Sequence, residues 1–103
     1  MSDALGGDPH TAAGLFELLS DETRVRIVRE LYHHWQRAPD DPCLPFSTLC
    51  ARVEGDDSGR FNYHLNRLCG TLVDKREHGY ALSPLGICLG QFVSEDGPAP
   101  IRV

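Results

Sequence analysis

Side chains that hydrogen-bond to flat partners gather in one short stretch of this sequence, DDSGRFNYHLNRL at residues 56–68. Between Arg60 and Arg67 it holds two guanidinium groups, two amides, a phenol and an imidazole. Base edges in the DNA major groove are partners of this kind, because arginine pairs well with guanine and asparagine with adenine. The stretch therefore predicts a contact with DNA, provided that one face of one element presents it.

The charge of the chain is uneven in a way that fits this expectation. The whole sequence has a formal net charge of −5. From residue 58 to residue 76, however, four bases stand against one acid, so this window is +3 and the remainder is −8. A cationic segment on an acidic body directs one face toward an anion. Lys75 is the only lysine, and arginine bias with excess acid favours a GC-rich, salt-adapted source.

Length and composition predict one small domain. The chain has 103 residues, 41% of them apolar, enough for one modest core. We expect residues 1–10 to be disordered, 11–93 to form the domain and 94–103 to be a flexible tail. No membrane span or secretion signal is recognisable, which predicts a cytoplasmic protein. Its four cysteines are then expected to be free thiols.

Helical periodicity predicts two helices in the first third of the chain. One covers residues 11–19. The next begins with Ser20 or Asp21, either of which can cap its first turn. Arg24 is expected off its apolar stripe, where it would contact a DNA phosphate or form a salt bridge on its own helix. The stripe consists of Ile27, Val28, Leu31 and Trp35.

The polar stretch is predicted to be the second helix of a pair. A proline-rich segment with a very short extended piece at Cys43 and Leu44 leads to a short helix capped by Ser47, and EGDD makes the turn. The second helix covers about residues 57–69, with His64 half-buried. Its buried side is formed by Phe61, Leu65 and Leu68, and its outward side by Arg60, Asn62, Tyr63, Asn66 and Arg67.

A hairpin and a last helix are expected after this pair. The segments LVDKRE, HG and YALS have the pattern of strand, two-residue turn and strand, which places the turn at His78 and Gly79. Ser83 and Pro84 then begin the last helix as N-cap and first residue. That helix is apolar nearly all round, which favours burial against a partner subunit. The candidates for core and dimer interface are Leu15, Leu18, Leu19, Ile87, Leu89 and Phe92.

This order of elements predicts a mainly α fold with a small β-hairpin wing, the winged helix-turn-helix, in which the chain runs α-α-short β-α-α-β-β-α. In such a fold the second helix of the pair lies in the DNA major groove. The wing, at residues 72–83, would then contact the backbone. The expected DNA contacts are Ser58, Arg60, Asn62, Tyr63, Asn66, Arg67, Lys75 and Arg76.

Three motifs in the right order resemble the ArsR family of winged-helix repressors. LSDETRVRIVREL has the D-x-x-R-x-x-I-x-x-x-L spacing of the family's opening, FNYHLNRL is similar to its recognition-helix core, S-R-H-L-x-x-L, and GYALSPLG is similar to the end of its wing. The set, over about residues 12–93, most resembles short ArsR-like regulators of halophilic archaea. The resemblance implies a homodimeric, sequence-specific DNA-binding transcriptional regulator.

The sequence departs from that family at several places, two of which bear on function. Asn62 and Tyr63 replace the usual Ser-Arg pair, which predicts a different base preference. The cysteine-rich metal box of some members is absent, and only Cys50 lies there. The adjacent His33 and His34 point about 100° apart on a helix and do not form a ligand pair.

Two other functions stay open beside DNA recognition. One is a winged-helix module that binds protein through the same surface, and the other is a metal- or thiol-responsive form of the repressor. Neither a nucleophile–base pair nor a Gly-rich phosphate loop is recognisable, so we expect no enzyme. The expected partners are double-stranded DNA and a second copy of the chain, with no cofactor, metal, membrane or small-molecule substrate.

Overall fold

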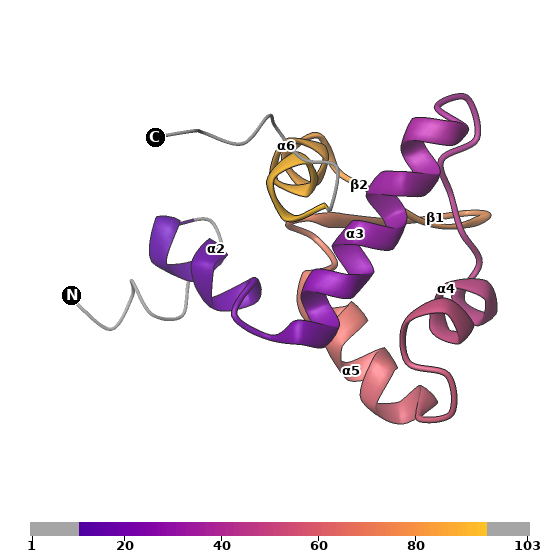
Figure 1. Cartoon of the computed structure of the whole chain (residues 1–103), viewed down its shortest axis with the longest axis horizontal. Helices are drawn as coiled ribbons and strands as arrows, with labels where there is room; N and C mark the ends of the chain where they lie inside the picture. The colour runs from indigo at the N-terminus through magenta and orange to yellow at the C-terminus, as the bar shows by residue number, and fades with distance from the viewer. Residues whose placement is uncertain (1–10, 95–103) are drawn as a thin grey trace, which may run out of the picture.

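The computed structural model describes residues 11–94, which fold around one central helix, α3. Figure 1 shows α3 crossing the middle of the molecule, with α4 and α5 on one side of it and α2 and α6 on the other. The elements are α2 (Ala12–Leu18), α3 (Glu22–Arg37), α4 (Phe46–Val53), α5 (Ser58–Leu68), β1 (Val73–Arg76), β2 (Gly79–Leu82) and α6 (Pro84–Val93).

The predicted fold class is confirmed. The described chain is mainly helical with one two-stranded antiparallel hairpin, in the order of a winged helix-turn-helix. The short extended piece is also present, because Leu44 forms an isolated antiparallel bridge with Tyr80 of β2. The expectations for residues 1–10 and 95–103 lie outside the described residues, whereas Ser94 is described and buried.

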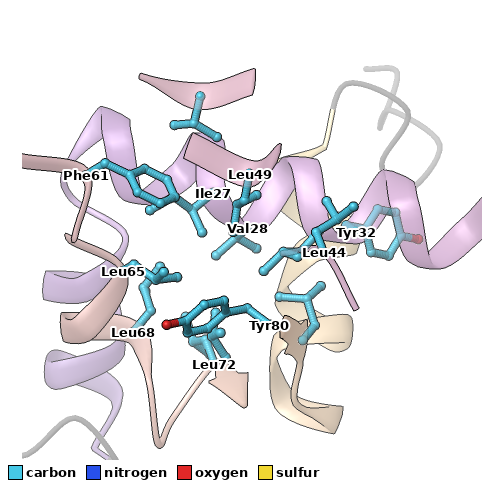
Figure 2. Close-up of a cluster of buried hydrophobic side chains, with 14 of the residues drawn as sticks. Ile27, Val28, Tyr32, Leu44, Leu49, Phe61, Leu65, Leu68, Leu72 and Tyr80 are labelled. Atoms are coloured by element: carbon cyan, nitrogen blue, oxygen red, sulfur yellow. The ribbon is translucent and has the colours of Figure 1, made fainter. Parts of the chain in front are cut away.

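One hydrophobic core joins the helices to the hairpin (Figure 2). It forms because the apolar stripe of α3 faces the apolar side of α5, as the spacing of both predicts. Tyr80 and Leu72 close the core from the hairpin side. The side chains with no exposed surface include Ile27, Val28, Leu31, Leu49, Phe61, Leu65, Leu68, Leu72 and Val73.

Capping residues fix where the two longest helices begin. The Asp21 carboxylate accepts hydrogen bonds from the backbone N–H groups of Thr23 and Arg24, at 2.8 and 3.3 Å. Asp57 caps α5 in the same way, accepting from the N–H of Arg60 at 2.9 Å. Both side chains satisfy N–H groups that the first turn of a helix leaves without intrahelical partners.

The predicted start of α4 was wrong by two positions. The helix begins at Phe46 with Pro45 at the cap position, and no side chain caps it, whereas Ser47 was expected to be the cap. The ring of Phe46 packs edge-on against Phe61, with ring centroids 5.2 Å apart. Drawing Phe46 into the helix aims its ring at the core, and this packing outweighs one capping hydrogen bond.

The predicted hairpin turn was wrong by one residue. Arg76 pairs with Gly79, so the loop consists of Glu77 and His78 and Gly79 belongs to β2. A Cβ on Gly79 would lie 2.4 Å from the carbonyl oxygen of Leu44. Only glycine lets the two backbones come this close, and it also accepts the positive φ of 139° found there.

Candidate nucleic-acid interface

The outward side of α5 is polar and accessible, as the sequence predicts. Phe61, Leu65 and Leu68 hold the opposite side of the helix against the core, all with no exposed surface. Because these anchors fix the rotation of the helix about its axis, the polar side chains have a set direction. The outward side chains, called here the polar face of α5, are Arg60, Asn62, Tyr63 and Asn66, all exposed, and Arg67, which is half-exposed.

Arg67 is bonded on two sides within the protein. Its guanidinium donates a hydrogen bond to the Tyr63 hydroxyl at 3.2 Å and another to the carboxylate of Glu17, on α2. The Tyr63 hydroxyl and the nearby carboxylate raise the pKa of Arg67, so it stays charged. The pairing aligns two members of the polar face with each other. It also places an acid beside the cation that the sequence predicts to contact DNA.

Arg24 is buried, and its predicted contact with DNA phosphate was wrong. Only 4% of the residue is exposed. Its Nε donates to the Leu18 carbonyl at 2.6 Å, its Nη2 to the Glu17 carbonyl at 3.2 Å, and its Nη1 to Nδ1 of His64 at 2.9 Å. A salt bridge within α3 was the alternative, but the acid nearest to it, at 3.6 Å, is Glu17 of α2. Arg24 thereby ties α2 and α5 to α3.

His64 is a buried, neutral member of this network. Arginine can only donate, so Nδ1 of His64 accepts and the ring proton lies on Nε2, 3.7 Å from a carboxylate oxygen of Asp21. Burial lowers the pKa of His64, with the charges of Arg24 and Arg60 acting in the same direction and Asp21 opposing them. The residue therefore supports α5 from behind and does not belong to its polar face.

Acids occupy the N-terminal end of α5. The Asp57 carboxylate takes the N–H of Arg60, and the N–H of Ser58 donates to the Asp56 carbonyl at 3.2 Å. Two of the amides that could have met a phosphate are thus already bonded. Ser58 itself is exposed. The side chains further along α5 are therefore better placed than its N-terminal amides for the predicted contact with DNA.

The wing carries two of the predicted contacts, Lys75 and Arg76, both exposed on β1. Arg76 lies 3.8 Å from the carboxylate of Asp74, an exposed pair that a stronger anion can displace. Neither residue is bonded to α5. Of the four cations predicted to contact DNA, Arg67 and Arg76 have acid partners. Arg60 and Lys75 have no acid within ion-pair distance among residues 11–94, so these two are the most available for phosphate.

The cysteines do not assemble a metal site. Within the described residues, no three histidine, cysteine or acidic side chains come together in a way that could hold a metal ion. Cys50 is buried, Cys43 and Cys69 are half-buried, and Cys88 is exposed. Burial raises the pKa of the Cys69 thiol, which makes it less reactive.

The predicted dimer candidates differ in accessibility. Leu18 is only 2% exposed and belongs to the core of its own chain. Leu15, Leu19, Ile87 and Leu89 are partly buried and pack against that core. Phe92 of α6 is 70% exposed, and Phe16 of α2, which was not among the candidates, is 74% exposed. These two rings are the largest apolar surfaces the two helices present.

The roles of two residues of the site were not predicted from the sequence. Glu17 is the partner of Arg67, and the buried Arg24 links α2 and α5 to α3. Glu17 is fifty positions from Arg67, and its own helix gives no sign of the contact. Arg24 did leave a signal: it precedes the apolar pair Ile27 and Val28 at helical spacing. That position lies at the border of the buried stripe.

A winged helix-turn-helix with an exposed polar second helix is the class of protein that this fold and surface define. Residues 12–93 match the family model described as a domain of unknown function, DUF7347, and the chain belongs to that family. No curated protein and no solved structure matches the chain. Across the described part of the chain, every helix is too short or too polar to cross a membrane.

Proposed function

We propose that the protein is a sequence-specific DNA-binding transcriptional regulator that acts as a homodimer. The observation that carries this proposal is the polar face of α5. It combines guanidinium, amide and phenol groups on one exposed side of a helix whose other side is fully anchored. Side chains held in this way suit base edges in the major groove, since direct readout needs donors and acceptors in fixed directions.

Within this proposal the two ends of the surface have different roles. Asn62, Asn66 and Tyr63 carry uncharged groups that can distinguish bases. Arg60 and Lys75, which have no acid within ion-pair distance among residues 11–94, would contact phosphate and fix the register of the protein on the duplex. The ArsR-like arrangement of the motifs supports the same assignment. The rest of the sequence carries a net charge of −8, which favours DNA at this face over the remainder of the chain.

Selection from a random-sequence duplex pool tests the proposal, followed by affinity measurements over a salt series. We expect an enriched motif, whose affinity falls with rising salt. Asn62→Ala should weaken binding to that motif by about 1–3 kcal/mol and relax preference at one position. Lys75→Ala should weaken all sequences similarly and reduce the salt slope by about 1. Arg37→Ala, an exposed arginine at the far end of α3, is the control and should change neither.

The alternative is a winged-helix module that binds protein through this surface. Absence of DNA binding at any salt, in a protein with unchanged helicity and cooperative unfolding, would sink the DNA proposal and favour that alternative. A metal- or thiol-responsive repressor would in addition lose or gain DNA affinity with zinc, arsenite or oxidant. Unchanged affinity with all three agents would remove it.

A further inference from the structure

A pocket of about 270 Å³ lies against α3 and α4, away from the polar face of α5. From α3 it is lined by Arg26, Arg29, Glu30 and His33, which share one face of the helix because they are spaced i, i+3, i+4 and i+7. Arg52 of α4 completes the lining. Three of its five lining residues are arginines in a chain of net charge −5. We call this the arginine pocket.

The cations of the arginine pocket are incompletely neutralised. Arg26 pairs with Glu22 at 2.9 Å, and Arg52 lies 3.7 Å from Glu30. Arg29 has no acid within ion-pair distance among residues 11–94. Its Nε donates to the carbonyl of Val93 at 2.8 Å, which leaves both terminal amino groups without a bonded partner there. A half-buried guanidinium in this state attracts an anion more strongly than a fully hydrated one.

His33 supplies a second, independent sign of a missing partner. Its Nε2 atom is buried and has no hydrogen-bond partner among the described residues. Buried polar atoms are nearly always bonded in folded proteins, so such an atom calls for an explanation. His33 lines the arginine pocket, and a turn of its ring toward the pocket would let Nε2–H donate a hydrogen bond to a bound oxygen atom.

A neighbouring pocket of about 360 Å³ shares Arg26 and Arg29 but differs in charge. It is also lined by Asp21 and Glu22, and the carboxylate of Glu22 faces Arg26. The two carboxylates of this neighbouring pocket repel an anion. Arg26 and Arg29 therefore favour an anion on their other side, in the pocket that His33 lines. The charge pattern thus selects the arginine pocket.

We propose that the arginine pocket binds a small oxyanion, either a phosphate group or the carboxylate of a small acid. Guanidinium groups bind both through paired N–H···O bonds. A volume of about 270 Å³ lies at the lower end of ligand pockets, so the ligand is small. No residue of the pocket belongs to the polar face of α5 or to the wing. The inference therefore stands apart from DNA binding and is tested without DNA.

The test titrates the full chain with inorganic phosphate and, separately, with succinate, using chloride to hold the ionic strength constant. Nitrogen chemical shifts of the His33 ring and backbone amide shifts along α3 report binding. We expect saturable shifts at His33, and tighter binding of one anion identifies the source as phosphate or carboxylate. Arg29→Gln should weaken binding about tenfold or more, since it removes a charge-assisted donor.

Two further variants make the result decisive. Arg29→Gln also loses its bond to Val93, so Arg26→Gln, whose side chain is 51% exposed, gives a second substitution with little risk to folding. It should also weaken binding severalfold. Arg37→Gln removes the same charge from the same helix but lines neither pocket, and should leave binding unchanged. Shifts that do not saturate with either anion, or equal weakening by Arg37→Gln, overturn the inference.

Discussion

At the scale of single residues, Arg67 is a member of the polar face of α5 that already has an acid partner within the protein. It is bonded to Glu17 of α2, and any phosphate or guanine must compete with that carboxylate. On the proposed function, Glu17→Gln should therefore tighten DNA binding. Exposed ion pairs contribute about 0.2–1 kcal/mol, so we expect a gain of about 1.4- to fivefold, measured by fluorescence anisotropy at fixed salt.

Net charge alone would also raise the affinity of this variant, so a matched control is needed. Glu22→Gln removes the same charge from α3, where Glu22 pairs with Arg26. It should change DNA affinity by less than Glu17→Gln does. Equal gains in the two variants would show that Glu17 acts only through the overall charge, and that its bond to Arg67 does not restrain binding.

The burial of His64, beside Arg24, gives the stability of the fold a defined pH dependence. The pKa of His64 is below its ordinary value of 6.5, chiefly because the ring is buried. As the pH falls through 6.5, His64 takes up a proton in the unfolded chain before it does so in the folded one. Stability is therefore complete above about pH 6.5 and decreases as the pH falls toward the folded pKa. Urea unfolding between about pH 7.5 and 5.5 measures this decrease.

His64→Asn isolates the contribution of this residue. An asparagine oxygen can accept the hydrogen bond from Arg24 in place of Nδ1 but does not titrate in this range. The variant should lose part of the pH dependence over the same window. A wild-type slope retained in full would assign the effect to other groups and contradict the neutral, accepting state of His64.

The residue scale shows where prediction from sequence ends. The outward direction of Asn62 and Asn66 follows from the apolar spacing of their own helix, so it could be predicted. For Arg24 the sequence shows only a position at the border of the buried stripe. Its partners could not be predicted, because they are carbonyl groups at the end of α2 and a ring of α5, elements whose placement no local pattern encodes. Charged residues are rarely buried, and this general expectation gave the wrong environment for Arg24.

At the scale of elements, Gly79 governs the attachment of the wing to the body. Leu44 and Tyr80 exchange two backbone hydrogen bonds, each 2.9 Å long, and Gly79 lies directly beside them. Gly79→Ala places a methyl group against the Leu44 carbonyl, at a separation that real side chains do not tolerate. We expect a loss of roughly 2 kcal/mol or more in the free energy of unfolding, measured by urea denaturation.

Gly55→Ala is the matched control for this prediction. Gly55 also has a positive φ, 80°, but nothing lies within 4 Å of where its Cβ would be. Its substitution should cost only the backbone strain, about 1–2 kcal/mol. If both variants lose the same stability, the contact with Leu44 contributes nothing beyond φ.

The elements themselves were largely predictable, and their errors share one cause. The α5 and α6 boundaries follow from apolar periodicity and from Ser83 and Pro84 at the start of α6. The start of α4 and the hairpin turn were misplaced because the positions of Phe46 and Gly79 are set by contacts with distant residues, Phe61 and Leu44. The residues of local turns and caps predict where an element begins and ends. The prediction is wrong where a tertiary contact at that end stabilises the fold more than the local hydrogen bond does.

At the scale of the whole molecule, α2 and α6 each carry one exposed aromatic ring. Phe16 and Phe92 are both more than two-thirds exposed, and Figure 1 places their helices on the same side of α3. A chain this small leaves such rings uncovered only at a cost in solubility. A two-fold dimer through these helices would cover them, and would present two copies of α5 to successive grooves.

Phe92→Gln tests this arrangement, with Tyr63→Gln as its counterpart. In a two-fold interface each ring occurs twice, so losing it costs the dimer about 3 kcal/mol or more, roughly a hundredfold in dissociation constant. Sedimentation equilibrium should show a monomer at concentrations where the wild type is a dimer. Tyr63 is 56% exposed on α5, so Tyr63→Gln should remain dimeric and lose DNA affinity instead. If assembly and DNA recognition occupy different faces, substitutions on the two surfaces must act separately. Dissociation of both variants into monomers, or of neither, would therefore contradict a dimer built on α2 and α6.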